Sequence, residues 1–146
     1  MNPDAYDDPE LEEAWCAERR QEVAEYLRGQ GVPHGQIGEW PTWHFAPYVS
    51  IWAVESAVHS GRMGWWVFAG DGPTDYLSAS EFPHPREAMA ALAARWTSVA
   101  AAMERGEPHP TVAIGSPESW PTLGPLLRSR AQMLLSISED DAAWAE

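Results

Sequence analysis

The chain has 146 residues, hydrophobic side chains at 45% of positions and a formal net charge of −13. That size and mix are typical of one globular domain. All nine basic residues are arginines, and the large excess of carboxylates makes nucleic acid and anionic membranes unfavourable partners. The charge favours a basic protein as partner because complementary fields speed encounter. A simpler alternative is that the charge only keeps the protein in solution.

Cysteine content and the first residues indicate a compartment. A single cysteine, Cys16, excludes an internal disulfide. No apolar run approaches the ~20 residues that span a bilayer, and the acidic start lacks the pattern of a secretory signal. We therefore expect a cytoplasmic protein with one globular domain over residues 1–146, whose acidic ends are frayed near residues 1–7 and 139–146.

The first helix has clear start and stop signals. Asp8 and Pro9 have the residue types of an N-cap and a first helical position, and Gly29 and Gly31 end the apolar pattern that follows. Glycines and prolines then predict a loop over residues 31–47, although this stretch is rich in aromatic residues.

Two apolar runs predict the centre of a sheet. In residues 48–54, both sets of alternating positions are mainly apolar, so both faces of a strand there would be apolar. This pattern is typical of a strand covered on both sides. Residues 63–69 predict a second strand, antiparallel to the first because the two are neighbours in the chain. We expect a short third strand over residues 75–80.

Two further helices complete the predicted fold. Pro85 suits the first position of a helix, and the third helix is expected to start near Thr122 or Leu123, with Pro125 tolerated in its first turn. Residues 111–114 predict one short extended piece. The fold class is therefore α+β, a small antiparallel sheet packed against about three helices. The second helix carries an apolar stripe of Met89, Leu92, Trp96, Val99 and Met103.

A long string of motifs covers the first two thirds of the chain. It runs through WC at residues 15–16, GEWPTWH at 38–44, APYVSIWAVES at 46–56, GWWV at 64–67, PTDY at 73–76 and HPREA at 84–88. This string resembles an uncharacterised bacterial family of short Trp-rich proteins, classed as a domain of unknown function. The resemblance implies a bacterial source and some role for the Trp-rich stretch. It supplies no catalytic residues.

No strong catalytic motif is present, and the sequence predicts no cofactor and no metal. Asp71 and Asp75 surround a Gly-Pro turn, where they can act as acid and base or hold a hard cation, or simply bond to local backbone. Glu55 and His59 stand four residues apart but fall in a predicted turn. The five histidines have no linking pattern. Acidic neighbours are expected to raise the pKa of the Cys16 thiol and make it unreactive.

Nine tryptophans are the most unusual feature of the composition. Trp65 and Trp66 are adjacent in a predicted strand, so their rings must face opposite sides of the sheet. At least one of these rings then meets a second layer, a pocket or a partner, although a bulky core explains the aromatic residues equally well. The candidate binding residues are Trp40, Trp43, His44, Tyr48, Trp52, Glu55, Trp65, Trp66, Asp71, Asp75 and Tyr76.

Two functional hypotheses follow. The first is a non-catalytic acidic binding protein that neutralises a basic partner, whose binding is lost in Trp52→Ala or Trp66→Ala. The second is a small enzyme or small-molecule binder that uses Glu55, Asp71 and Asp75 beside the aromatic cluster, and it requires these carboxylates to converge on one cavity. A homodimer formed through exposed strand faces is compatible with both.

Overall fold

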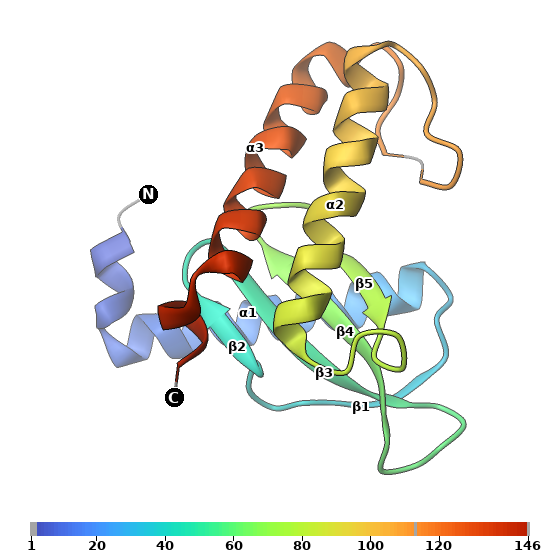
Figure 1. Ribbon diagram of the computed structural model, residues 1–146. Helices are drawn as coiled ribbons and strands as arrows, with labels where there is room; N and C mark the ends of the chain where they lie inside the picture. Colours follow the sequence, from blue (N-terminus) through green and yellow to red (C-terminus); the bar gives the residue numbers. More distant parts are fainter. Residues whose placement is uncertain (1–2, 113, 146) are drawn as a thin grey trace. The chain divides into compact units, whose positions relative to one another are not determined.

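The computed structural model describes residues 3–112 and 114–145, and the chain divides into two compact units, Met1–Pro85 and Arg86–Glu146. Within these described residues, three α-helices and a five-stranded antiparallel sheet confirm the predicted α+β class (Figure 1). The elements are η1 (Pro3–Asp7), α1 (Pro9–Gly29), β1 (His34–Ile37), β2 (Trp43–Phe45), β3 (Val49–Ser56), β4 (Met63–Gly70), β5 (Asp75–Ser78), α2 (Pro85–Glu104), α3 (Trp120–Glu139) and η2 (Asp141–Trp144).

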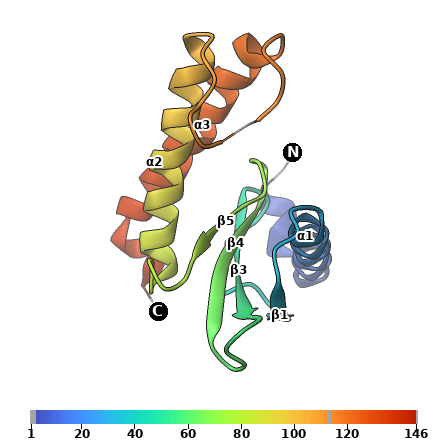
Figure 2. The ribbon, with the colours of Figure 1, turned by 90° about the vertical axis from the view of Figure 1, so that its right-hand side faces the viewer.

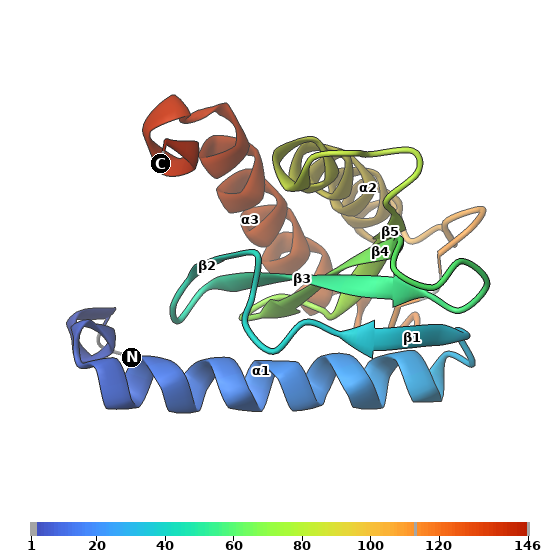
Figure 3. The same ribbon diagram turned by 90° about the horizontal axis from the view of Figure 1, so that it is seen from below.

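The sheet of the first unit is built around β3. Its strands are ordered β1-β3-β4-β5, and β2 also pairs with β3. Strand β1 pairs with the end of β3 near Ser56, whereas β2 pairs with the end that begins at Val49. The two short strands thus share one side of β3, while α1 runs along one face of the sheet (Figure 3).

The prediction of a loop over residues 31–47 was wrong where β1 and β2 form. This stretch contains two strands, of four and three residues. Strands this short show no alternating pattern, and the glycines and prolines around them are typical of a loop. The two strands form because β3 otherwise leaves its backbone N–H and C=O groups without partners on that side. The N–H groups of Gly38 and Thr42 extend this pairing, with bonds of 3.0 and 2.8 Å to the carbonyls of Ala53 and Ile51.

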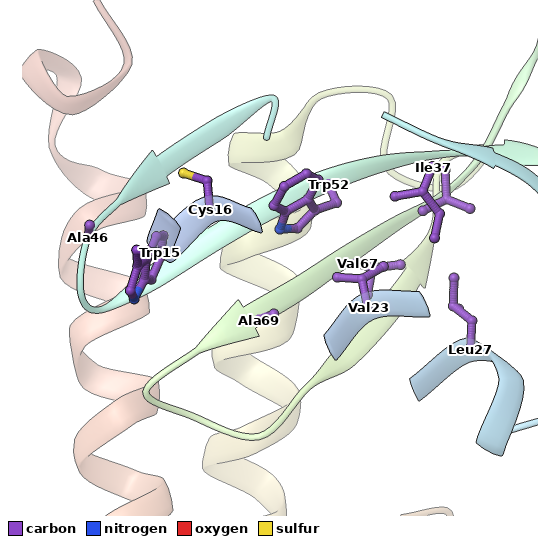
Figure 4. Packing of buried hydrophobic residues seen from close by; sticks show 10 residues of the cluster. Trp15, Cys16, Val23, Leu27, Ile37, Ala46, Trp52, Val67 and Ala69 are labelled. Atoms are coloured by element: carbon purple, nitrogen blue, oxygen red, sulfur yellow. The ribbon is translucent and has the colours of Figure 1, made fainter. Parts of the chain in front are cut away.

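Helix α1 starts where its sequence predicts. The Asp8 carboxylate caps it by accepting a 2.9 Å hydrogen bond from the N–H of Glu10, and Pro9 is its first residue. Seen along its axis, α1 lies flat against one face of the sheet (Figure 2). The core between them joins Trp15, Cys16, Val23 and Leu27 of α1 to Ile37, Ala46, Trp52, Val54, Val67 and Ala69 (Figure 4).

The second unit contains the helices α2, α3 and η2, and residues 105–119 connect α2 to α3. The predicted apolar stripe of α2 is buried along its whole length. At Gly124 of α3, an added Cβ would come within 3.3 Å of Met103 Cβ, so glycine permits a close approach of α2 and α3. Arg128 of α3 donates a 2.7 Å hydrogen bond to Glu104 of α2.

Some boundaries and segments differ from expectation or remain predictions. Helix α3 begins at Trp120 rather than at Thr122 or Leu123. The extended piece expected over residues 111–114 includes residue 113, which lies outside the described residues. Residues 1, 2 and 146 of the predicted frayed ends do so as well. In the described part of the tail, the indole N–H of Trp144 donates a 3.0 Å hydrogen bond to the carbonyl of Ile137.

Candidate binding groove

Two of the predicted binding tryptophans are interior residues. The side chains of Trp52 and Trp66 are only 0% and 2% exposed. The indole N–H of Trp52 donates to the Ser50 hydroxyl at 2.8 Å, and that of Trp66 donates to the carbonyl of Phe82 at 2.6 Å. Each ring is thus buried with its polar atom paired, which leaves it no surface to offer a partner.

Trp65 and Trp66 do point to opposite faces of the sheet, as the strand periodicity requires. Trp65 pairs with Val54, which faces α1, whereas Trp66 pairs with Ala53 on the other face. The half-buried Trp65 ring stands edge-on to Tyr76, with ring centroids 5.4 Å apart, and Tyr76 meets Tyr26 of α1 at 6.0 Å. These rings extend the core beyond the fully buried residues.

Three of the candidate binding residues, Trp43, Tyr48 and Asp71, lie near β2 and the turn that follows it. Trp43 pairs with Ile51, and the half-buried Tyr48 ring meets Phe45 edge-on, with ring centroids 5.3 Å apart. At the other end of this turn, the carbonyl of Tyr48 accepts a 2.9 Å hydrogen bond from the N–H of Asp71. Asp71 therefore follows β4 at the end of the sheet where β3 begins.

The three carboxylates of the enzyme hypothesis do not converge. Glu55 pairs with Met63 at one end of the β3–β4 ladder, and Asp71 follows Gly70 at the other end. Val49, the partner of Gly70, is six residue steps from Glu55 along β3, and steps of about 3.3 Å each put roughly 20 Å between those ends. Asp75 accepts a 2.8 Å hydrogen bond from the N–H of Tyr76. Among the described residues, no group of three or more His, Cys, Asp or Glu side chains is placed to hold a metal ion.

The Glu55 carboxylate is held by backbone N–H groups. Its two carboxylate oxygens accept hydrogen bonds of 3.0 and 2.8 Å from the N–H groups of Gln36 and Gly61. These two bonds lower the pKa of the carboxyl group. Glu55 thus ties β1 to the β3–β4 turn, and its carboxylate also occupies the space that a Cβ at residue 35 would need, which glycine leaves free.

One predicted residue, Trp40, stands at the surface beside a hollow. The Arg20 side chain of α1 donates hydrogen bonds of 2.8 and 2.9 Å to the carbonyls of Gly38 and Ile37. These bonds hold the β1–β2 connection, which carries Glu39 and Trp40, next to the helix. Between them is an open groove of about 470 Å³, which we call the α1 groove. It is lined by Glu13, Cys16, Ala17, Arg20, Gln21, Ala24, Glu39 and Trp40.

The Trp40 indole forms one wall of the α1 groove and is 48% exposed. Its ring stands edge-on to the His44 imidazole at a centroid distance of 5.4 Å and an interplanar angle of 87°. His44 Nε2 lies 3.6 Å from a carboxylate oxygen of Glu12, and the His44 ring lies 6.4 Å from that of Trp15. The exposed Trp40 ring therefore packs on His44, which itself lies against Glu12 and Trp15.

Cys16 lines the α1 groove but is not a candidate nucleophile. Its side chain is 1% exposed. Burial, and next the negative charge of Glu12, raise the pKa of the thiol to about 11. This confirms the expected direction of the shift, although burial contributes more than the acidic neighbour. The thiolate, which is the reactive form, is therefore rare at neutral pH.

The comparison with protein families covers both units. A family model described as a domain of unknown function (DUF4826) matches residues 9–144. The chain belongs to the DUF4826 family. The match extends through the C-terminal third, which the sequence resemblance left out, and the family description assigns DUF4826 no activity. No curated protein and no solved structure matches the chain.

Sequence reasoning found Trp40 and His44 in this DUF4826 chain but missed Glu13, Arg20 and Glu39. Glu39 lies in the GEWPTWH motif directly before Trp40, and that position is a usable signal. Arg20 gave none, because its partners are backbone carbonyls 17 and 18 residues away. Also within the described residues, no helix is both long and apolar enough to cross a membrane.

Proposed function

We propose that this protein is a non-catalytic acidic binding protein that takes a basic segment of a partner protein in the α1 groove. The observation that carries the proposal is the half-exposed Trp40 indole beside two groove carboxylates, Glu13 and Glu39. The face of an indole attracts a guanidinium or ammonium group, and carboxylates add charge-assisted hydrogen bonds. A lysine or arginine side chain matches this combination of groups.

The wider charge supports the same partner. A net charge of −13 attracts a basic protein over a distance of about 10 Å at ordinary ionic strength and repels phosphate backbones. Tryptophan is enriched among the few residues that carry most of the energy of protein interfaces. We propose the cytoplasm of a bacterium as the place where the protein acts, and neutralisation of the basic partner as the consequence of binding.

The enzyme alternative has no comparable support. Glu55 is engaged by two backbone N–H groups and stands at the far end of the β3–β4 ladder from Asp71. No described contact favours the homodimer over a monomer, so self-association stays a prediction of the sequence.

The test is capture of partners from cells of the source organism with tagged protein, at low and high salt. Wild-type protein should retain one basic protein in fixed ratio, and binding should weaken as salt rises. Trp40→Ala, and separately the double variant Glu13→Gln/Glu39→Gln, should each lose that protein by at least tenfold.

Matched controls separate the groove from general charge. Phe45 is 49% exposed, nearly the same as Trp40, and does not line the groove, so Phe45→Ala should retain the partner. Glu118→Gln/Glu139→Gln removes the same two charges from exposed positions outside the groove. Equal loss in the groove and control variants, or a partner that is not basic, would refute the proposal.

A further inference from the structure

A second hollow in the first unit differs from the α1 groove in its charge. It has a volume of about 380 Å³ and lies where β3 connects to β4. We call it the turn hollow. It is lined by Pro33, Ser56, Ala57, Val58, His59, Arg62, Met63, Gly64, Trp65 and Ser80. Among the described residues that line it, Arg62 and His59 are basic and none is a carboxylate.

The turn hollow is built by a bulge in the hairpin. Val54 pairs with Trp65 but Glu55 pairs with Met63, so Gly64 is an extra residue in β4. A Cβ on Gly64 would lie 2.9 Å from the Ser56 Cα, closer than such atoms approach, so glycine permits this packing. A bulge of this kind turns the following side chains relative to the partner strand, here Trp65.

The turn itself is held by hydrogen bonds. The Ser56 hydroxyl accepts bonds of 3.2 Å from the N–H groups of both Val58 and His59. The N–H of Ser56 donates to the carbonyl of Arg62 at 2.8 Å, and the N–H of Arg62 donates to the carbonyl of His59 at 3.1 Å. The backbone that carries Arg62 and His59 is therefore fixed before any ligand arrives.

Arg62 differs from most arginines of this acidic chain. Arg86, Arg105 and Arg128 each make an ion pair with a carboxylate within 3.2 Å. The exposed guanidinium groups of Arg62 and Arg28 make no hydrogen bond or ion pair with any residue that the structure describes. Of these two arginines, only Arg62 lines the turn hollow, where its guanidinium is open to a ligand.

Apolar surface stands beside this free guanidinium. Met63 is 44% exposed and Val58 is 82% exposed, and the half-buried Trp65 ring and Pro33 complete the apolar lining. Pockets for small molecules are mainly apolar, measure about 300 to 1,000 Å³, and hold a few polar groups that orient the ligand. A guanidinium beside an aromatic ring suits a planar anionic group with an apolar body.

We propose that the turn hollow binds a small organic anion, with the anionic group on Arg62 and the apolar body against Trp65 and Met63. This site goes beyond the proposed partner groove and does not depend on it. Because the overall charge of the protein repels anions, binding rests on short-range contacts, and added salt should not weaken it strongly.

The test uses a fluorescent anion and its uncharged analogue. Titration of the wild-type protein with 8-anilinonaphthalene-1-sulfonate should give saturable binding, and N-phenyl-1-naphthylamine, which lacks the sulfonate, should bind at least tenfold more weakly. Arg62→Gln should weaken binding of the sulfonate about tenfold, the size expected for one charge-assisted hydrogen bond. Arg62→Lys, which keeps the charge, should restore part of the affinity.

Two controls make the result decisive. Arg105→Gln removes the same charge at a position that does not line the hollow, and it should bind the sulfonate as wild type does. On addition of the sulfonate, backbone amide NMR signals of residues 56–64 should shift most. Equal affinity for both probes, equal loss in Arg62→Gln and Arg105→Gln, or shifts centred elsewhere would overturn the proposal. Arg62→Gln should leave partner capture by the α1 groove unchanged, so the two proposals fail separately.

Discussion

Arg20 Nε in α1 donates a 2.8 Å hydrogen bond to the carbonyl oxygen of Gly38, eighteen residues later in the chain. A second bond of 2.9 Å, from Arg20 Nη2, reaches the carbonyl of Ile37. The planar guanidinium suits this double contact. It joins the helix to the connection that carries Trp40, and thereby fixes both sides of the α1 groove.

Replacing Arg20 should loosen the groove. Arg20→Ala removes both bonds and leaves two carbonyls without a charged donor, so we expect a loss of about 1.5–3 kcal/mol in the free energy of unfolding. Urea denaturation measures this loss, and hydrogen exchange should become faster at the amides of residues 38–42. Arg28→Ala, at the exposed end of α1, is the control and should cost less than about 1 kcal/mol. Similar effects from the two variants would contradict the role given to Arg20.

Alanine variants of Trp52 and Trp40 should distinguish a residue that stabilises the fold from one that is available for binding. Trp52 is fully buried with its N–H bonded, so Trp52→Ala should lower the free energy of unfolding by about 3–5 kcal/mol through the cavity it leaves. Trp40→Ala should change it by less than about 0.5 kcal/mol because the ring is half exposed. Both values come from urea denaturation. A large loss in Trp40→Ala would mean that its ring holds the fold and would remove the argument for a binding role.

The lowered pKa of Glu55 predicts that the free energy of unfolding depends on pH in the acidic range. Its pKa is lowered in the folded protein from the ordinary value of 4.5 by hydrogen bonds from Gln36 and Gly61. The stability it contributes is therefore fully present above pH 4.5 and is lost as the pH falls through the lower folded value. Wild-type protein should be more stable than Glu55→Gln at pH 6, and the difference should shrink toward pH 3 in parallel urea titrations. A difference that stays constant with pH would show that the charge of Glu55 contributes nothing.

Cys16 should be unreactive in the folded protein. Its pKa of about 11 lies above the ordinary value of 9.0, so the neutral thiol stabilises the fold fully below pH 9, and that contribution is lost as the pH rises toward 11. Ellman's reagent should label Cys16 slowly at pH 8 in buffer and rapidly in urea. Rapid labelling in buffer would place the thiol at the surface.

Signals close together in the chain predicted the helices. Asp8 and Pro9 mark the start of α1 because capping involves residues two apart, and the α2 stripe repeats every three or four residues. The strands β1 and β2 escaped prediction because three or four residues show no pattern of their own. They form only because β3, several residues further on, offers unpaired backbone groups.

The candidate site divides in the same way. The sequence by itself determined the acidic charge, the abundance of tryptophan and the opposite orientation of Trp65 and Trp66, which follows from strand geometry alone. Only the tertiary structure decided that Trp52 and Trp66 are buried while Trp40 is exposed, and that Glu55 and Asp71 stand apart. Side-chain exposure depends on which distant segments pack together, and those contacts, such as Arg20 with Gly38, have no periodic signature in the chain.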